Sequence, residues 1–403
     1  MKIRINEHAV LIYITIVIIT LSESVFFNNR GLNNTLEYLG YFLLLSSILL
    51  SFIKESNNLN KKRDACSFLL VLILSGIGLW FQNVSITRFF VLQFTIFAIA
   101  IISVLSSNYM SSLRIIRGSA YALLVGIALA ILLGLVSGDG IWDQINTGAG
   151  IFGIPLGFNG GMVFKNYFSA DILIIYICLS IYERCEEYKS VDKVVQFFCA
   201  FFCVLSNSRG GLVLLAIYCI ALNYSIVFRI KKKYIKIFIL CVMIIGFALF
   251  VKFYNNILDS FGTYAYRFRG LINYLNYYEG DGFHMFFGNA ESFYDKDVSY
   301  VMAVRSTTGF DGSLEMSWLN ILIKSGLLGI AAYVIIFFRL FKIAVRATNQ
   351  KISTCMIALT LTCLVSSLVE AYIQSIHCVF GVMCYLIING LYGYDRKRGD
   401  NND

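Results

Sequence analysis

Apolar residues fill most of this chain in continuous blocks, and polar residues gather in the short stretches between them. Each block holds about 15 to 22 residues, which is the length a helix needs to cross a hydrocarbon core of about 30 Å. Backbone polar groups find no water there, so the blocks that cross must be α-helices. The pattern therefore predicts an all-α polytopic membrane protein, with residues 1–403 forming a single integral membrane domain.

The blocks predict about twelve transmembrane helices, which puts both termini on one side of the membrane. The predicted ranges are 9–27, 38–53, 66–81, 89–107, 119–137, 166–182, 194–207, 211–228, 237–253, 316–338, 353–373 and 378–394. Two long connections face the other side, residues 138–165 and residues 254–315. The first is rich in glycine and contains Pro155, the only proline of the chain, which suits a closely packed or re-entrant loop.

The positive charges give the orientation, because Lys and Arg accumulate in cytoplasmic loops. With Met1 in the cytoplasm, 23 of the 33 Lys and Arg residues fall inside, nine fall outside and Lys324 lies within a helix. One of the inside clusters consists of Arg339, Lys342 and Arg346. The formal net charge of +9 is therefore explained by topology, and nucleic acid is not needed as a partner.

Composition removes several other classes of protein. Charged residues make up 14% of the chain, whereas soluble domains carry about 25%. The eleven cysteines lie in predicted helices or on the predicted inside, which leaves no disulfide framework on the outer face. The three histidines are scattered along the chain, and the acids have no metal-ligand spacing. The sequence predicts neither a metal site nor a cofactor.

Two short polar stretches at the predicted outer face are candidates for phosphate binding. Lys165 and Asn166 stand where the first long connection meets a helix, and the lysine either attracts a phosphate or simply extends to the membrane interface. The stretch Asn207–Gly211, NSRGG, forms a tight turn between two apolar blocks. Arg209 has a planar donor fork that suits phosphate oxygens. The alternative is an arginine that extends to the interface beside glycines used for helix packing.

The large connection 254–315 supplies further candidates. Arg267 and Arg269 lie in a stretch of aromatic and aliphatic residues whose spacing suits a helix at the bilayer surface, where lipid phosphates would meet them. Arg305 follows in its polar second half. Glu315 opens the next apolar block, where it is either a favourable partner for the helix dipole or a general base at the membrane surface.

The order of these motifs carries a family resemblance. Along the chain the motifs are Lys165–Asn166, Ser208–Gly211, Arg267 or Arg269, the turn Phe287–Gly288, and Glu315 followed by Gly326 and Gly329. This order, with a basic inner loop and one helix before the large loop, resembles the O-antigen polymerase and ligase superfamily over about residues 150–340. Ligases of that superfamily typically have His followed by Asn where this chain has Glu315 and Met316. The difference favours the polymerase branch, the Wzy-type enzymes.

The resemblance implies an architecture similar to GT-C glycosyltransferases in a bacterial inner (cytoplasmic) membrane, with both termini cytoplasmic and both long connections periplasmic. It implies a metal-independent glycosyltransferase that polymerises undecaprenyl-diphosphate-linked oligosaccharide repeat units into O-antigen or capsular polysaccharide. Donor and acceptor are both lipid-linked glycans, and a polysaccharide chain-length regulator is an implied partner. The implied catalytic residues are Glu315, Arg209 and Arg305, and the implied diphosphate- and substrate-binding residues are Arg267, Arg269, Lys165 and Asn166.

Two other functions stay open on the same topology. An O-antigen ligase would use the same donor and deliver the glycan to lipid A core, and Glu315 in place of histidine argues against it. A flippase or other transporter of lipid-linked oligosaccharides could also have twelve helices. Transporters usually show internal repeats and broken helices at the middle of the membrane, which this sequence does not show.

Overall fold

The computed structural model describes residues 7–54, 58–82, 84–144, 156–186, 189–228, 271, 274–276, 278–290 and 316–399. This part of the chain is mostly helical. Its helices are α1 (Glu7–Ser22), α2 (Val25–Asn29), α3 (Asn33–Ile53), α4 (Asn58–Trp80), α5 (Ile86–Ala100), α6 (Leu113–Ser137), α7 (Lys165–Cys185), α8 (Ser190–Leu205), α9 (Arg209–Phe228), α13 (Gly282–Phe287), α16 (Ser317–Arg346), α17 (Gln350–Val369) and α18 (Val379–Gly399). A π-helix, η1 (Ile101–Leu105), and a 3-10 turn, η2 (Ser106–Asn108), continue α5.

Six helices in the described part are long and apolar enough to cross a membrane. They are Asn33–Ile53, Lys62–Trp80, Ile86–Asn108, Leu113–Ser137, Ser317–Arg346 and Gln350–Leu368. Helix α1 and the first part of α9 are apolar but shorter. The structure thus agrees with an all-α membrane protein. The number of about twelve spans stays a prediction, since the predicted range 237–253 lies outside the described residues.

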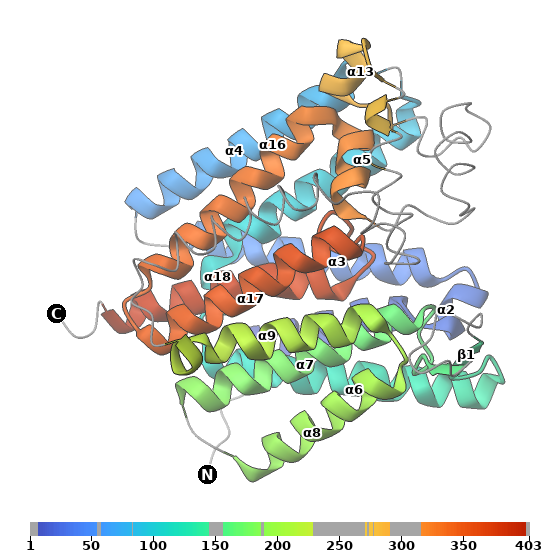
Figure 1. The fold of residues 1–403 in the computed structure, drawn as a ribbon, viewed down its shortest axis with the longest axis vertical. Helices are drawn as coiled ribbons and strands as arrows, with labels where there is room; N and C mark the ends of the chain where they lie inside the picture. The colour runs from blue at the N-terminus through green and yellow to red at the C-terminus, as the bar shows by residue number, and fades with distance from the viewer. Residues whose placement is uncertain are drawn as a thin grey trace.

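The helices are arranged in two groups with a central pair (Figure 1). Helices α4, α5 and α16 lie on one side, and α6, α7, α8 and α9 lie on the other. Helices α17 and α18 lie between the groups, where α17 packs against both α9 and α16. The largest apolar cluster runs through both groups, so the described helices share one core.

Contacts between connections define two ends of the bundle. At one end, called the terminal end, His8 Nε2 of α1 lies 3.0 Å from the carbonyl oxygen of Tyr109, and Lys397 of α18 bonds Ser111. At the other, called the loop end, Asn29 Nδ2 donates to Asp139 Oδ1 at 2.9 Å. Helix α6 joins the two ends, and its 25 residues rise about 37 Å. The start of α1 and the end of α18 therefore lie together.

The loop end differs in two details from the sequence-based prediction. The first helix was expected over 9–27, yet α1 stops at Ser22 and the Ser24 hydroxyl caps the separate helix α2. Part of the connection 138–165 forms an antiparallel pair of strands, β1 (Trp142–Gln144) and β2 (Leu156–Phe158). Strands of three residues are too short to show an alternating pattern. The described end of the connection packs against α2, because the Val25 N–H donates to the Gly161 carbonyl at 2.8 Å, while Pro155 lies outside the described residues.

A buried arginine joins four elements toward the terminal end. The guanidinium of Arg339 in α16 donates to Asp64 Oδ1 in α4 at 3.3 Å and to Asn389 Oδ1 in α18 at 2.7 Å. It also donates to the carbonyl oxygens of Ser103 and Val104 in the π-helix at 3.1 and 2.9 Å. The sequence pattern ended this helix at residue 338 and counted Arg339 in a cluster of charges on the inside. The predicted helix end is wrong, because α16 continues to Arg346 and buries Arg339 inside the bundle.

Two glycines fix the described end of the large connection to α16. Gly288 ends α13 with φ +89°, which confirms the turn predicted at Phe287–Gly288. Gly326 interrupts the helical geometry of α16 with φ +61°, and a Cβ there would lie 2.2 Å from the Phe286 carbonyl oxygen. The Gln82 side chain spans this contact by donating to the carbonyls of Phe287 and Lys324 at 2.6 and 3.1 Å. The backbones of α13 and α16 therefore touch directly.

Substituting Gly326→Ala is expected to destabilise the protein. The new Cβ meets a backbone carbonyl, and a left-handed conformation costs a non-glycine residue about 1–3 kcal/mol. We expect a lower midpoint of thermal unfolding in detergent, followed by intrinsic fluorescence. Gly282→Ala in α13 is the matched control, because its Cβ would meet nothing within 4 Å. An unfolding midpoint for Gly326→Ala equal to that of the control would contradict this close packing.

Candidate functional site

The two polar stretches identified in the sequence meet at the loop end of the bundle. Helix α7 begins at Lys165 and α9 begins at Arg209. The Ser208 hydroxyl donates to Asn166 Oδ1 at 2.9 Å, and the Lys165 ammonium donates to the Asn207 carbonyl at 3.1 Å. Three predicted site residues, Lys165, Asn166 and Arg209, are therefore brought together. We call this region, with the acids Asp143 and Glu370, the loop-end site.

The residues of the NSRGG turn suit the tight backbone turn and the helix start that they form. Asn207 adopts φ +54°, a left-handed conformation that asparagine tolerates better than most residues. Ser208 caps α9, since its hydroxyl oxygen accepts the Gly211 N–H at 3.3 Å. Gly211 packs against α7 so closely that a Cβ would lie 1.7 Å from Ser169 Oγ. These residues shape the turn and leave the Arg209 side chain partly exposed beside it.

The electrostatics of the loop-end site favour an anion. Helices α7 and α9 both start here, so the positive ends of two helix dipoles face the same region. Lys165 and Arg209 add two cationic side chains that act on each other. Burial lowers the pKa of the Lys165 ammonium, the nearby Asp143 carboxylate raises it, and the Arg209 guanidinium lowers it. The Lys165 ammonium therefore lies near a second positive charge, that of Arg209.

Two acids accompany these two cations. Asp143 Oδ2 accepts the backbone N–H of Lys165 at 3.0 Å, and its Oδ1 accepts from the Asn159 amide at 2.6 Å. Glu370 Oε1 lies 3.5 Å from the Asn166 amide nitrogen, which donates to it. The four charged side chains therefore balance in formal charge. A diphosphate at this site would need further positive charge from other residues.

The segment that follows Glu315 enters the bundle at this site. Ser317, the first residue of α16, donates its N–H and its hydroxyl to the Glu370 carbonyl oxygen at 3.2 and 2.6 Å. The Tyr372 hydroxyl donates to the Asn166 carbonyl at 3.2 Å. The connection after α17 thus links the start of α16 to the start of α7. Glu370 and Tyr372 were not among the predicted site residues.

A buried group of carboxyls lies on another face of α7, and sequence analysis also missed it. Asp171 in α7 is fully buried, and its carboxyl acts electrostatically on that of Glu23, which is 5% exposed. Glu23 Oε1 also accepts the Val379 N–H at 2.7 Å. Nearby, Glu37 Oε2 pairs with His377 Nδ1 at 2.7 Å.

Glu23 and Asp171 are both ionisable groups in buried surroundings. Both acids interrupt predicted apolar blocks, 9–27 and 166–182. That interruption was the available signal, because ionisable groups in membrane segments usually have a functional or pairing role.

The remaining predicted site residues lie outside the described part of the chain. These are Arg267, Arg269, Arg305 and Glu315. Comparison with models of known protein families and with curated proteins gives no match for this chain. The choice of function therefore depends on the motifs and on the geometry of the loop-end site.

Proposed function

We propose that this protein is a polysaccharide polymerase that extends glycans carried on undecaprenyl diphosphate, acting at the periplasmic face of a bacterial inner membrane. The observation that carries the proposal is the meeting of Lys165–Asn166 with Ser208–Arg209. These two motifs are about forty residues apart in the sequence and share one site at the end of the bundle predicted to be periplasmic.

In this proposal the cationic residues stabilise the diphosphate leaving group. In the transferred glycan, the bond between the anomeric carbon and the diphosphate breaks, and negative charge develops on undecaprenyl diphosphate. Arg209, together with Arg267 or Arg269, stabilises that charge through paired donors. Lys165 and the dipole ends of α7 and α9 add to the same field. Arg305 contacts either phosphate or sugar.

The acceptor needs a base. A hydroxyl at the non-reducing end of a single lipid-linked repeat unit attacks the anomeric carbon, forms the new glycosidic bond and gives up its proton. Glu315 takes this proton in the proposed mechanism. Support comes from its neighbours in the chain, since Ser317 starts α16 against Glu370 in the loop-end site. In the same proposal Asn166, which Ser208 and Tyr372 hold in position, orients the substrate.

The glycan ladder of a strain lacking this gene tests the proposal directly. On a gel that resolves single repeat units, we expect one repeat on its acceptor and no longer bands. Restoring the gene should restore the ladder. Loss of all attached glycan with long lipid-linked polymer would instead indicate a ligase. Repeat units trapped on the cytoplasmic leaflet would indicate a flippase.

A further inference from the structure

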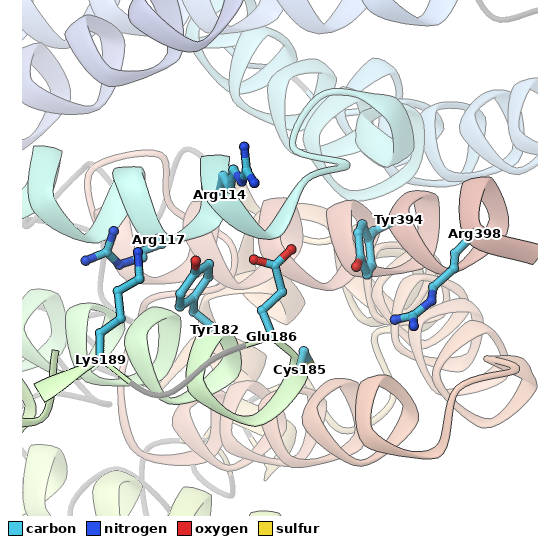
Figure 2. A pocket seen from close by; sticks show the side chains of 8 residues that line it. All are labelled: Arg114, Arg117, Tyr182, Cys185, Glu186, Lys189, Tyr394 and Arg398. Atoms are coloured by element: carbon cyan, nitrogen blue, oxygen red, sulfur yellow. The ribbon is translucent and has the colours of Figure 1, made fainter. Parts of the chain in front are cut away.

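A charged pocket opens at the terminal end of the bundle (Figure 2). It has a volume of about 660 Å³ and lies between the start of α6, the connection from α7 to α8, and the end of α18. Its wall carries four cationic side chains, Arg114, Arg117, Lys189 and Arg398, and one carboxylate, Glu186. Helix α7 has 21 residues, so the pocket is about 30 Å from the loop-end site. It is therefore a separate site.

One of the four cations is already neutralised. The Arg117 guanidinium donates from Nε and Nη2 to the two oxygens of Asp192, both at 2.8 Å. Burial raises the pKa of Asp192, but the hydrogen bonds from Arg117 and Tyr121 and the nearby positive charges together lower it, so the net shift is downward and the pair is ionic. Arg117 thus joins α6 to α8 and forms a fixed wall of the pocket. Its charge is not available for a ligand.

The other three cationic side chains can bind an anionic ligand. Arg114 and Arg398 are exposed, and within the described residues neither forms an ion pair. The Lys189 ammonium lies 5.6 Å from the ring centre of Tyr182, and it also acts electrostatically on Asp192. Among the described lining residues, one carboxylate, that of Glu186, stands against these three positive charges. The described lining therefore carries a surplus of two positive charges, which favours a phosphate group.

Glu186 adds selectivity. Figure 2 shows its carboxylate between Tyr182 and Tyr394, with Arg114 on the facing helix. A carboxylate among cations repels a bare anion but accepts a hydrogen bond from a hydroxyl or ammonium group. A ligand that carries such a donor beside its phosphate satisfies both kinds of group at once. Glycerol phosphate has this combination, either free or as the headgroup of phosphatidylglycerol.

We propose that this pocket binds a phosphate group that has a hydroxyl or ammonium donor beside it, with Arg114, Lys189 and Arg398 holding the phosphate and Glu186 accepting from the neighbouring donor. The positive-inside pattern places this end in the cytoplasm, so the ligand comes from the inner leaflet or from the cytoplasmic solution. If the pocket does not bind such a ligand, the proposed polymerase activity is unaffected, because the two sites lie at opposite ends of α7.

The test uses the full-length protein in phosphatidylcholine nanodiscs and follows the midpoint of thermal unfolding. One arm adds glycerol phosphate at constant ionic strength, and the other replaces part of the lipid by phosphatidylglycerol. A ligand that binds only the folded protein raises the midpoint, here by about 2 °C or more. A rise in the first arm identifies a soluble phosphate, and a rise confined to the second identifies a lipid headgroup.

The double variant Arg114→Gln, Arg398→Gln should lose this rise. Both side chains are exposed, so folding should survive. The matched control is Lys54→Gln, Lys62→Gln, which removes the same charge from exposed positions near the terminal end and should keep the rise. No rise in either arm would overturn the proposal. An equal loss in the two double variants would also overturn it, since surface charge alone would then explain the effect.

Discussion

Arg209→Lys is expected to lower the rate of polymer extension by about 100-fold or more, although the positive charge is kept. Lysine has no planar fork and cannot bind two phosphate oxygens in parallel. Removing one preorganised donor from a developing negative charge commonly costs about 100- to 1000-fold in rate. The distribution of glycan lengths in a complemented deletion strain measures this. The ladder should shorten to the first few repeats.

A matched control separates this effect from general surface charge. Arg30 is also at the loop end, where it pairs with Asp139 at 3.2 Å and lies over the Phe26 ring. Arg30→Lys should give a normal ladder. Membrane levels of both variants must be compared, because Arg209 begins α9 beside the close contact of Gly211 with Ser169. A full-length ladder from Arg209→Lys at normal protein levels would remove Arg209 from the site.

Much of the helical arrangement could be predicted from the sequence. The length of an apolar block is set by the bilayer, so the predicted ranges 38–53 and 119–137 end at the same residues as α3 and α6, although these helices begin five and six residues earlier. The meeting of Lys165–Asn166 with Ser208–Arg209 also follows from topology, because both stretches were predicted in connections on the same side. The short strands β1 and β2 leave no such signal.

Pairing between distant helices could not be predicted. Arg339 and Lys342 both follow an apolar block, and an interfacial cation and a buried one give the same pattern there. Whether such a cation is buried depends on the helices that pack around it. For Arg339 these are α4 and α18, which supply Asp64 and Asn389 as hydrogen-bond acceptors. Glu370 became a site residue for the same reason. Its contact with Asn166 depends on how α17 and α7 pack.

The Arg339 network gives the largest expected effect on stability. Arg339→Leu should lower the free energy of unfolding by about 3–5 kcal/mol, because it removes the buried guanidinium beside Asp64. The Asp64 carboxylate is 1% exposed and would keep only the longer contact with Arg63, at 3.6 Å. The carbonyls of Ser103 and Val104 in the π-helix lose their donors as well. Urea unfolding in detergent micelles measures the change. Arg346→Leu at the exposed end of the same helix should stay within about 0.5 kcal/mol of the wild type.

A double-variant cycle shows whether the buried charge is the cause. Asp64→Asn in the Arg339→Leu background removes the buried carboxylate that has lost its closer partner, so the double variant should be more stable than Arg339→Leu alone. The recovery should be incomplete, since the π-helix carbonyls still lack the guanidinium donors. If Asp64→Asn instead adds its own loss to that of Arg339→Leu, the two residues act independently. The arginine would then stabilise the fold through its carbonyl contacts and not through the ion pair.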